Sequence, residues 1–120
     1  MLWAAVAVGL LGSFTTVSAF AEQVAALVRG AGAPVIVGGD LNETADGAAR
    51  RLLDPLLRDP AGQSEHTFPA AGPVRRIDAI LAGEGVRVRD ARAIRSTARV
   101  GEERLSGASD HLPTLLDVSL

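Results

Sequence analysis

Three short polar motifs follow one another in this sequence, and each closes or interrupts an apolar run. Each motif supplies a carboxylate, and together they add one asparagine and one of the two histidines. Carboxylate oxygens bind Mg²⁺, and a histidine transfers protons near neutral pH. One such motif alone is weak evidence, but three in this order indicate metal-assisted phosphate chemistry. The motifs are Gly39-Asp40-Leu41-Asn42, Arg76-Ile77-Asp78 and Ser109-Asp110-His111.

The first motif places two polar side chains just beyond a short apolar run at 35–37. Alternate positions past a strand can point the same way. Asp40 can then bind Mg²⁺ or hold a water, and the Asn42 amide can donate to a phosphate oxygen. The alternative is ordinary turn chemistry, because Gly, Asp and Asn are favoured residues at turns.

The second and third motifs suggest a carboxylate and imidazole pair. Asp78 interrupts a predicted strand, where aspartate is unfavourable. It is either a solvent-facing residue of an edge strand or a partly buried carboxylate that orients the ring of His111. An oriented His111 can act as a general base, and Asp110 beside it can take a metal or a water. The alternative is a structural or surface histidine. His66, in a loop, is interpreted as structural or substrate-facing.

Electrostatics links these carboxylates to a cation. If Asp40, Asp78 and Asp110 converge, two bare carboxylates about 4 Å apart repel by roughly 4 kcal/mol at an effective dielectric constant near 20. Such a cluster requires a cation, a protonated histidine or raised pKa values. Mg²⁺ is the simplest solution, and it would also polarise a phosphoryl oxygen.

Local patterns predict the elements that must position these residues. Apolar residues at helical spacing predict a helix over 20–28 that ends at Gly30, and the run at 35–37 predicts a buried strand. A second helix is expected around 49–53, with Thr44 or Asp46 as its cap.

The second half of the sequence reads mainly as strands. A loop is expected over 58–73, followed by strands over 75–82 and 86–94 that a short turn joins into an antiparallel hairpin. A polar loop through Gly101 and Gly107 and a final strand from Pro113 complete a mixed α and β architecture.

Composition limits the class of protein. The 120 residues are 48% hydrophobic, enough for one small domain. The net charge of -2 argues against a generally basic nucleic-acid-binding surface. All basic residues are arginines, and several between Arg87 and Arg99 form either a local polyanion-binding face or a solvated strand face. The absence of cysteine excludes disulfides, thiolate metal sites and a cysteine nucleophile.

The first 19 residues are interpreted as a separate apolar segment, because Glu22 is the first charged residue. The segment is a signal-peptide core, a membrane-associated segment or a buried helix or strand. Export or membrane association and a cytoplasmic location therefore both stay open.

The order Gly-Asp-Leu-Asn at 39–42, Arg-Ile-Asp at 76–78 and Ser-Asp-His-Leu-Pro at 109–113 resembles the C-terminal half of the endonuclease/exonuclease/phosphatase superfamily, which has the deoxyribonuclease-I-like fold. The resemblance covers residues 20–120, which are taken as the domain. It implies an α+β fold, a partial β-sandwich flanked by helices. It also implies hydrolysis of phosphodiesters or phosphomonoesters with a divalent metal, Mg²⁺ or alternatively Mn²⁺.

The resemblance implies a role for each matching residue. Asp40 corresponds to the residue that positions or activates the attacking water, and Asn42 to the one that helps hold the phosphate and the metal. Asp78 corresponds to the residue that orients the catalytic histidine, here His111. Asp110 corresponds to a metal-associated carboxylate, so the expected metal ligands are Asp40 and Asp110.

One part of the family pattern is not matched. The family's N-terminal half carries its principal metal-ligand glutamate, and neither Glu22, Glu43 nor Glu65 has that motif context. The resemblance therefore implies a truncated domain with weak or no turnover. The alternatives are a non-catalytic remnant and an assembly component, whose exposed sheet face associates with itself or with a partner chain. The substrate stays open among phosphate esters of nucleic acid, lipid or small-molecule type.

Overall fold

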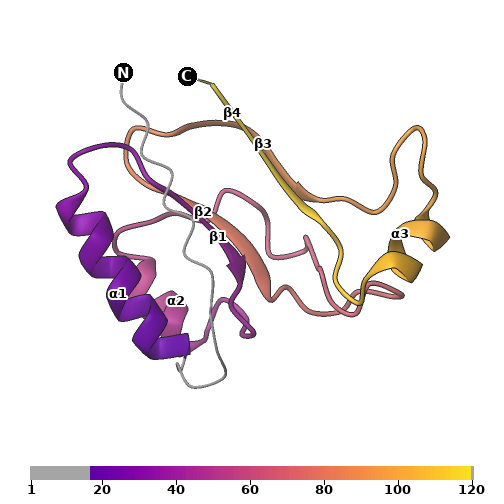
Figure 1. Ribbon diagram of the computed structural model, residues 1–120, viewed down its shortest axis with the longest axis horizontal. Coiled ribbons are helices and arrows are strands. Elements are labelled where there is room, and N and C mark those ends of the chain that lie inside the picture. The colour runs from indigo at the N-terminus through magenta and orange to yellow at the C-terminus, as the bar shows by residue number, and fades with distance from the viewer. Residues whose placement is uncertain (1–16, 120) are drawn as a thin grey trace.

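The computed structural model describes residues 17–119 and arranges them around two small sheets. Figure 1 shows α1 and α2 on one side of β1 and β2, with β3 and β4 on the other side and α3 at the far end. The predicted α+β class is confirmed. The elements are α1 (Val17–Gly30), β1 (Ile36–Asp40), α2 (Ala48–Leu53), β2 (Asp78–Ala82), β3 (Arg87–Ala93), α3 (Glu102–Ala108) and β4 (Thr114–Ser119).

Helix α1 forms because apolar side chains recur on one face. Phe20, Ala21, Val24 and Ala25 are buried on this face. Of the residues whose helical spacing predicted the helix, Phe20 and Val24 are buried and Val28 is partly buried, but Leu27 is 50% exposed. The helix ends at Gly30, as predicted, and the chain then turns into β1. The helix thus covers the sheet that carries the first polar motif.

Helix α2 begins without the predicted side-chain cap. Gly47 is the N-cap residue and makes no capping hydrogen bond from a side chain. Thr44 and Asp46 were the expected caps, but the Thr44 hydroxyl donates to the Asp46 carboxylate instead. Glu43 takes over part of the function, since its Oε1 accepts from the backbone N–H of Arg50 at 3.0 Å.

Strand β2 pairs antiparallel with β1, so the predicted hairpin between the two strands after residue 75 is wrong. Both edges of β2 are occupied, because β1 lies on one side and Arg58 exchanges two backbone hydrogen bonds of 2.8 Å with Ala82 on the other. Gly83 then donates to Val35 O at 2.8 Å, where an added Cβ would come within 3.1 Å of that oxygen. Glycine therefore fits this crowded position directly after the end of β2 better than a residue with a side chain.

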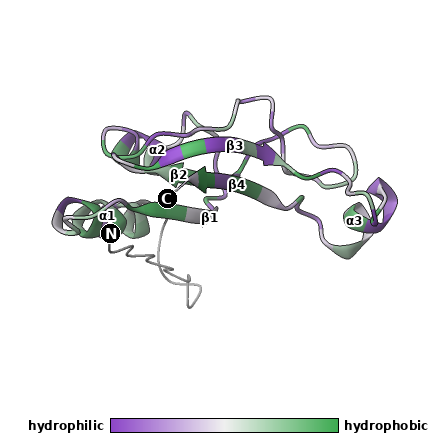
Figure 2. Ribbon diagram, turned by 90° about the horizontal axis from the view of Figure 1, so that it is seen from above, coloured by the Kyte–Doolittle hydropathy of each residue, from purple (hydrophilic) through white to green (hydrophobic). Residues whose placement is uncertain are grey.

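Strand β3 pairs antiparallel with β4, with an irregularity between Val88 and Asp90. Figure 2 shows this pair as a second layer over the first sheet. Strand β4 contacts β2, so the two sheets form the partial β-sandwich that the resemblance implied.

The expected polar loop over 101–107 is wrong, because residues Glu102–Ala108 form α3. Gly101 is its N-cap residue. The negative charges of Glu102 and Glu103 in the first turn interact favourably with the positive end of the helix dipole. No residue of α3 is buried, so the helix adds nothing to the core and serves as the approach to the third motif.

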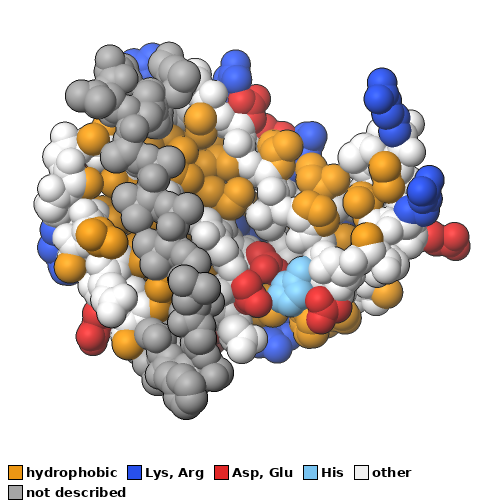
Figure 3. Space-filling model, viewed as in Figure 1, with side chains coloured by type: hydrophobic (Ala, Val, Ile, Leu, Met, Phe, Trp, Pro, Cys, Tyr) orange, Lys and Arg blue, Asp and Glu red, His pale blue; other side chains and the backbone are white. Residues whose placement is uncertain are grey.

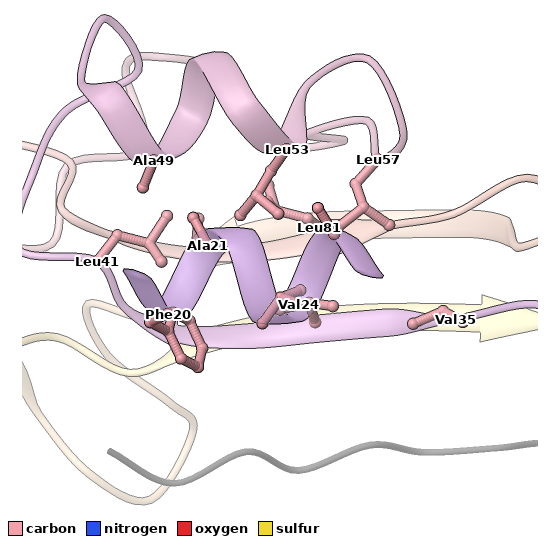
Figure 4. Packing of buried hydrophobic residues seen from close by; sticks show 12 residues of the cluster. Phe20, Ala21, Val24, Val35, Leu41, Ala49, Leu53, Leu57 and Leu81 are labelled. Carbon is pink, nitrogen blue, oxygen red and sulfur yellow. The ribbon is translucent and has the colours of Figure 1, made fainter. Parts of the chain in front are cut away.

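The core lies between α1, α2 and the first sheet. Figure 4 shows side chains from these elements pointing toward one another. On β2 and the residue before it, Ile77, Ala79 and Leu81 alternate along the strand and are 3%, 5% and 1% exposed, so the face that they share is buried. Leu53 is fully buried against this layer.

A buried ion cluster fastens α2 and the chain after it to the start of β2. Asp59 accepts from Arg76 Nη2 at 2.7 Å and lies 3.1 Å from Arg50 Nη1, and all three side chains are at most 7% exposed. Arg50 Nε also donates to Asp54 at 3.0 Å. The arginine of the second motif therefore holds the fold together through Asp59.

The segment assigned to residues 1–19 falls mostly on residues 1–16, outside the described part of the chain. Within residues 17–119, no helix combines the length and the apolar character that crossing a membrane requires.

Candidate functional site

Strand register brings the first two motifs together. Asp40, the last residue of β1, is the direct cross-strand partner of Asp78, the first residue of β2. Leu41 N donates to Ile77 O at 2.9 Å and extends the pairing by one residue. Two carboxylates far apart in sequence therefore lie side by side at one end of the sheet.

The third motif is placed on the same end by a loop of the intervening chain. Leu112 N donates to Thr67 O at 2.8 Å, and Ala70 N donates to Asp110 O at 2.7 Å. Ser109 Oγ accepts from the backbone N–H of His111 at 3.1 Å, a local turn that presents the ring.

Three carboxylates surround the His111 ring. Its Nδ1 lies 2.8 Å from Asp78 Oδ2, while its Nε2 lies 3.9 Å from Asp40 Oδ2 and 4.0 Å from Asp110 Oδ1. Figure 3 shows acidic side chains on both sides of a histidine on one face of the molecule. The structure thus brings together four of the five residues expected at the site.

These carboxylates differ in exposure. The Asp78 side chain is 15% exposed, whereas Asp40 and Asp110 are 49% and 79% exposed. Asp78 therefore supports the ring from inside, and the other two face the solvent.

Asn42 lies beside this group without joining it. Its backbone N–H donates to Asp40 Oδ1 at 2.7 Å, and its φ of 51° is the left-handed conformation that asparagine tolerates. Within residues 17–119, no hydrogen bond involves its side-chain amide. A role in holding phosphate or metal stays a prediction for this residue.

The sequence reasoning missed Thr67 and Phe68. The Thr67 hydroxyl donates to Asp78 Oδ2 at 2.6 Å, and the ring of Phe68 lies 5.0 Å from the ring of His111. Neither residue has a signal in the sequence, since both lie in a loop rich in proline and glycine. The neighbouring His66 forms no hydrogen bond through its ring within the described chain.

The glutamates without family context stay away from this group. Glu43 caps α2. Glu65 Oε2 accepts from the backbone N–H of Ala93, the last residue of β3, at 2.7 Å. Glu22 is exposed on α1.

The hydrogen bond to Asp78 raises the pKa of His111 above its ordinary value. Partial burial opposes this rise, and the negative charges of Asp78, Asp40 and Asp110 add to it. The protonated ring thus offsets part of the repulsion among the carboxylates.

We expect the NMR titration midpoint of His111 to lie above about 6.5, the ordinary value for histidine. Because the pKa is higher in the folded than in the unfolded state, the His111 charge stabilises the folded state fully below about pH 6.5. That stabilisation is lost as the pH rises through the folded pKa. The difference in unfolding free energy between the wild type and His111→Gln should therefore shrink between pH 6 and pH 9. A midpoint at or below 6.5 would contradict this.

The donor set fits a hard divalent cation. One ligand atom each from Asp40, Asp78 and His111 lies within 4.8 Å of the others. Asp78 Oδ2 is already engaged by His111 and Thr67, and Asp40 Oδ1 accepts from the backbone N–H of Asn42. The most accessible carboxylates are those of Asp40 and Asp110, which are 49% and 79% exposed. Mg²⁺ prefers one or two carboxylates and several waters, which these two exposed side chains allow.

Comparison with known proteins shows the family of this chain. A model of the Endonuclease/Exonuclease/phosphatase family matches residues 8–111. No curated protein gave a match.

Several solved structures have a similar fold. An endonuclease/exonuclease/phosphatase from Bacteroides vulgatus is 20% identical with a TM-score of 0.67, over 87% of this chain and 44% of that one. A functionally unknown conserved protein from Enterococcus faecalis V583 is 19% identical with a TM-score of 0.62, over 85% and 42%. The mannosyl-6-phosphatase Bt3783 from Bacteroides thetaiotaomicron VPI-5482 is 19% identical with a TM-score of 0.61, over 87% and 44%. The chain thus spans less than half the length of each of these proteins.

Proposed function

The chain belongs to the endonuclease/exonuclease/phosphatase family, and we propose that it hydrolyses phosphate esters by attack of an activated water on phosphorus. The observation that supports this most is the 2.8 Å contact between His111 Nδ1 and Asp78 Oδ2. This contact leaves Nε2 free and directed toward two exposed carboxylates, where a phosphate group would bind.

His111 supplies positive charge to the phosphate. Asp78 holds Nδ1, and its hydrogen bond raises the pKa of His111, which favours the protonated ring. Nε2–H can then donate to a phosphoryl oxygen and stabilise the charge that develops there. In this role the residue acts as a donor, rather than as the general base that the sequence suggested.

Asp40 receives the proton of the attacking water. Its carboxylate is half exposed, and Oδ1 is oriented by the backbone N–H of Asn42. As the water oxygen bonds to phosphorus, one of its protons passes to Asp40. The ester oxygen leaves with the electron pair of the broken P–O bond and takes a proton from solvent.

The divalent metal that the family implies would be held by Asp40 and Asp110. When bound, Mg²⁺ or Mn²⁺ would act as a Lewis acid toward a phosphoryl oxygen. The exposed position of both carboxylates leaves room for the waters that Mg²⁺ retains.

We expect slow hydrolysis of bis(p-nitrophenyl) phosphate or p-nitrophenyl phosphate in Mg²⁺ that stops when EDTA removes the metal. Turnover should be slow because none of the described glutamates joins the group of ligands. A sugar phosphate monoester belongs among the substrates tested, because one structural neighbour is a mannosyl-6-phosphatase.

A metal-binding measurement separates this function from its alternative. Mn²⁺ should broaden the NMR signals of His111, and excess Mg²⁺ should restore them by competing for the same carboxylates. Broadening without any turnover would favour a non-catalytic phosphate- or metal-binding remnant. Neither broadening nor turnover in a folded protein would overturn the proposed function.

A further inference from the structure

The Thr67 hydroxyl has all of its hydrogen-bonding capacity engaged at the site. Thr67 is fully buried, and its Oγ1 donates to Asp78 Oδ2 at 2.6 Å. The same oxygen accepts from the backbone N–H groups of Ile77 at 3.4 Å and Asp78 at 3.3 Å. A hydroxyl has one donor and two acceptor positions. With both acceptor positions filled, its single proton is directed to the Asp78 carboxylate.

The carboxylate oxygen that Thr67 contacts is the one that holds His111. Asp78 Oδ2 lies 2.6 Å from Thr67 Oγ1 and 2.8 Å from His111 Nδ1. The terminal torsion of an aspartate is broad, so a histidine contact alone leaves the carboxylate free to turn. A second donor on the same oxygen removes that freedom.

The backbone of Thr67 connects the same two segments. Its N–H donates to Arg75 O at 2.8 Å, near the start of β2, and its carbonyl accepts from Leu112 N at 2.8 Å, next to His111. Phe68, the following residue, places its ring 5.0 Å from that of His111. This loop therefore contacts Asp78 and His111 through its side chains, and Arg75 and Leu112 through its backbone.

We infer that Thr67 is a positioning residue that fixes the Asp78 carboxylate and, through it, the tautomer and orientation of His111. The inference rests on the proposed function for its relevance to turnover. Thr67 does not touch the substrate in this account. It keeps Nδ1 of His111 on Asp78, so that Nε2 faces the solvent side, where the protonated ring can donate to phosphate. In the neutral ring the same contact places the proton on Nδ1.

The test compares Thr67→Val, which keeps the shape and removes the hydroxyl, with Thr67→Ser, which keeps the hydroxyl. Long-range ¹H–¹⁵N NMR of the two histidine rings, at a pH where they are neutral, reports which nitrogen carries the proton. We expect the wild type and Thr67→Ser to show only the Nδ1–H form of His111. Thr67→Val should show the Nε2–H form as a second species, and its turnover should fall about tenfold or more.

A matched control separates this role from a general effect of losing a threonine. Thr97 Oγ1 also accepts two backbone N–H groups, from Arg99 at 3.3 Å and Val100 at 3.0 Å, in an exposed loop. Thr97→Val should leave the His111 spectrum unchanged.

The tautomer measurement needs neither metal nor substrate, so its outcome is independent of the proposed function. A folded Thr67→Val protein with a pure Nδ1–H form would overturn the inference, even if hydrolysis is intact. If Thr67→Val does not fold, the wild type still provides a test. A buried, bonded hydroxyl should give an observable proton signal that exchanges slowly, and an unobservably fast exchange would contradict the inference.

Discussion

In the His111→Ala variant, Mg²⁺-dependent hydrolysis of bis(p-nitrophenyl) phosphate should fall by about 100-fold or more, down to the rate measured without protein. The ring has no substitute in the site, because its Nε2 is the one nitrogen that faces both Asp40 and Asp110 among the described residues. Removing the ring also leaves the carboxylates of Asp40, Asp78 and Asp110 without the positive charge that lies between them.

The second histidine is a matched control for this variant. His66 lies outside the group of ligand atoms formed by Asp40, Asp78 and His111. His66→Ala should therefore keep the wild-type rate. Circular dichroism of both variants checks that they fold. A folded His111→Ala protein with more than half of the wild-type rate would contradict the assigned role.

The Asp59→Ala variant should lose about 3–5 kcal/mol of unfolding free energy, measured by urea denaturation. Asp59 is the shared partner of Arg50 and Arg76, and all three side chains are nearly excluded from solvent. Without this carboxylate, Arg50 keeps its contact with Asp54, and Arg76 loses its ion-pair partner. Small domains have only about 5–15 kcal/mol in total, so this loss is a large fraction of the stability.

An exposed ion pair provides the control. Arg89 and Asp117 lie 2.5 Å apart, but their side chains are 62% and 45% exposed. Asp117→Ala should therefore cost less than about 1 kcal/mol. If Asp59→Ala costs no more than Asp117→Ala, the buried cluster does not stabilise the fold as described.

Replacing the whole cluster of Arg50, Asp59 and Arg76 by apolar residues shows whether Asp59→Ala is unstable because of unpaired buried charge or because of lost packing. Changing Arg50 and Arg76 to Met together with Asp59→Leu removes the buried charges as a set. The triple variant should be far more stable than Asp59→Ala, because no unpaired charge stays inside.

Local pattern in the sequence was enough for several elements. The spacing of apolar residues predicted α1, and the glycines at 30 and 32 predicted its end, which falls at Gly30. Alternation indicated that Ile77, Ala79 and Leu81 share one face, and the structure shows this face buried. These features depend on residues a few positions apart, so periodicity reveals them. The motif order was also enough to indicate the family.

Long-range pairing was not predictable in the same way. The strands after residue 75 were expected to pair with each other, but β1 and the chain at Arg58 already occupy both edges of β2. The helix α3 was expected to be a loop, because Gly101 before it and Gly107 within it outweighed the helical preference of the other residues.

The amino-acid order therefore established which chemical groups are present, and in which order, at Asp40, Asp78 and Asp110-His111. The folded chain established their distances, because Asp40 and Asp78 meet only through the register of β1 and β2. It also revealed Thr67 as the partner of Asp78 and Asp59 as the partner of Arg76. A side-chain hydrogen bond between loop and strand depends on the position of both in space, and no periodic pattern along the chain encodes that position.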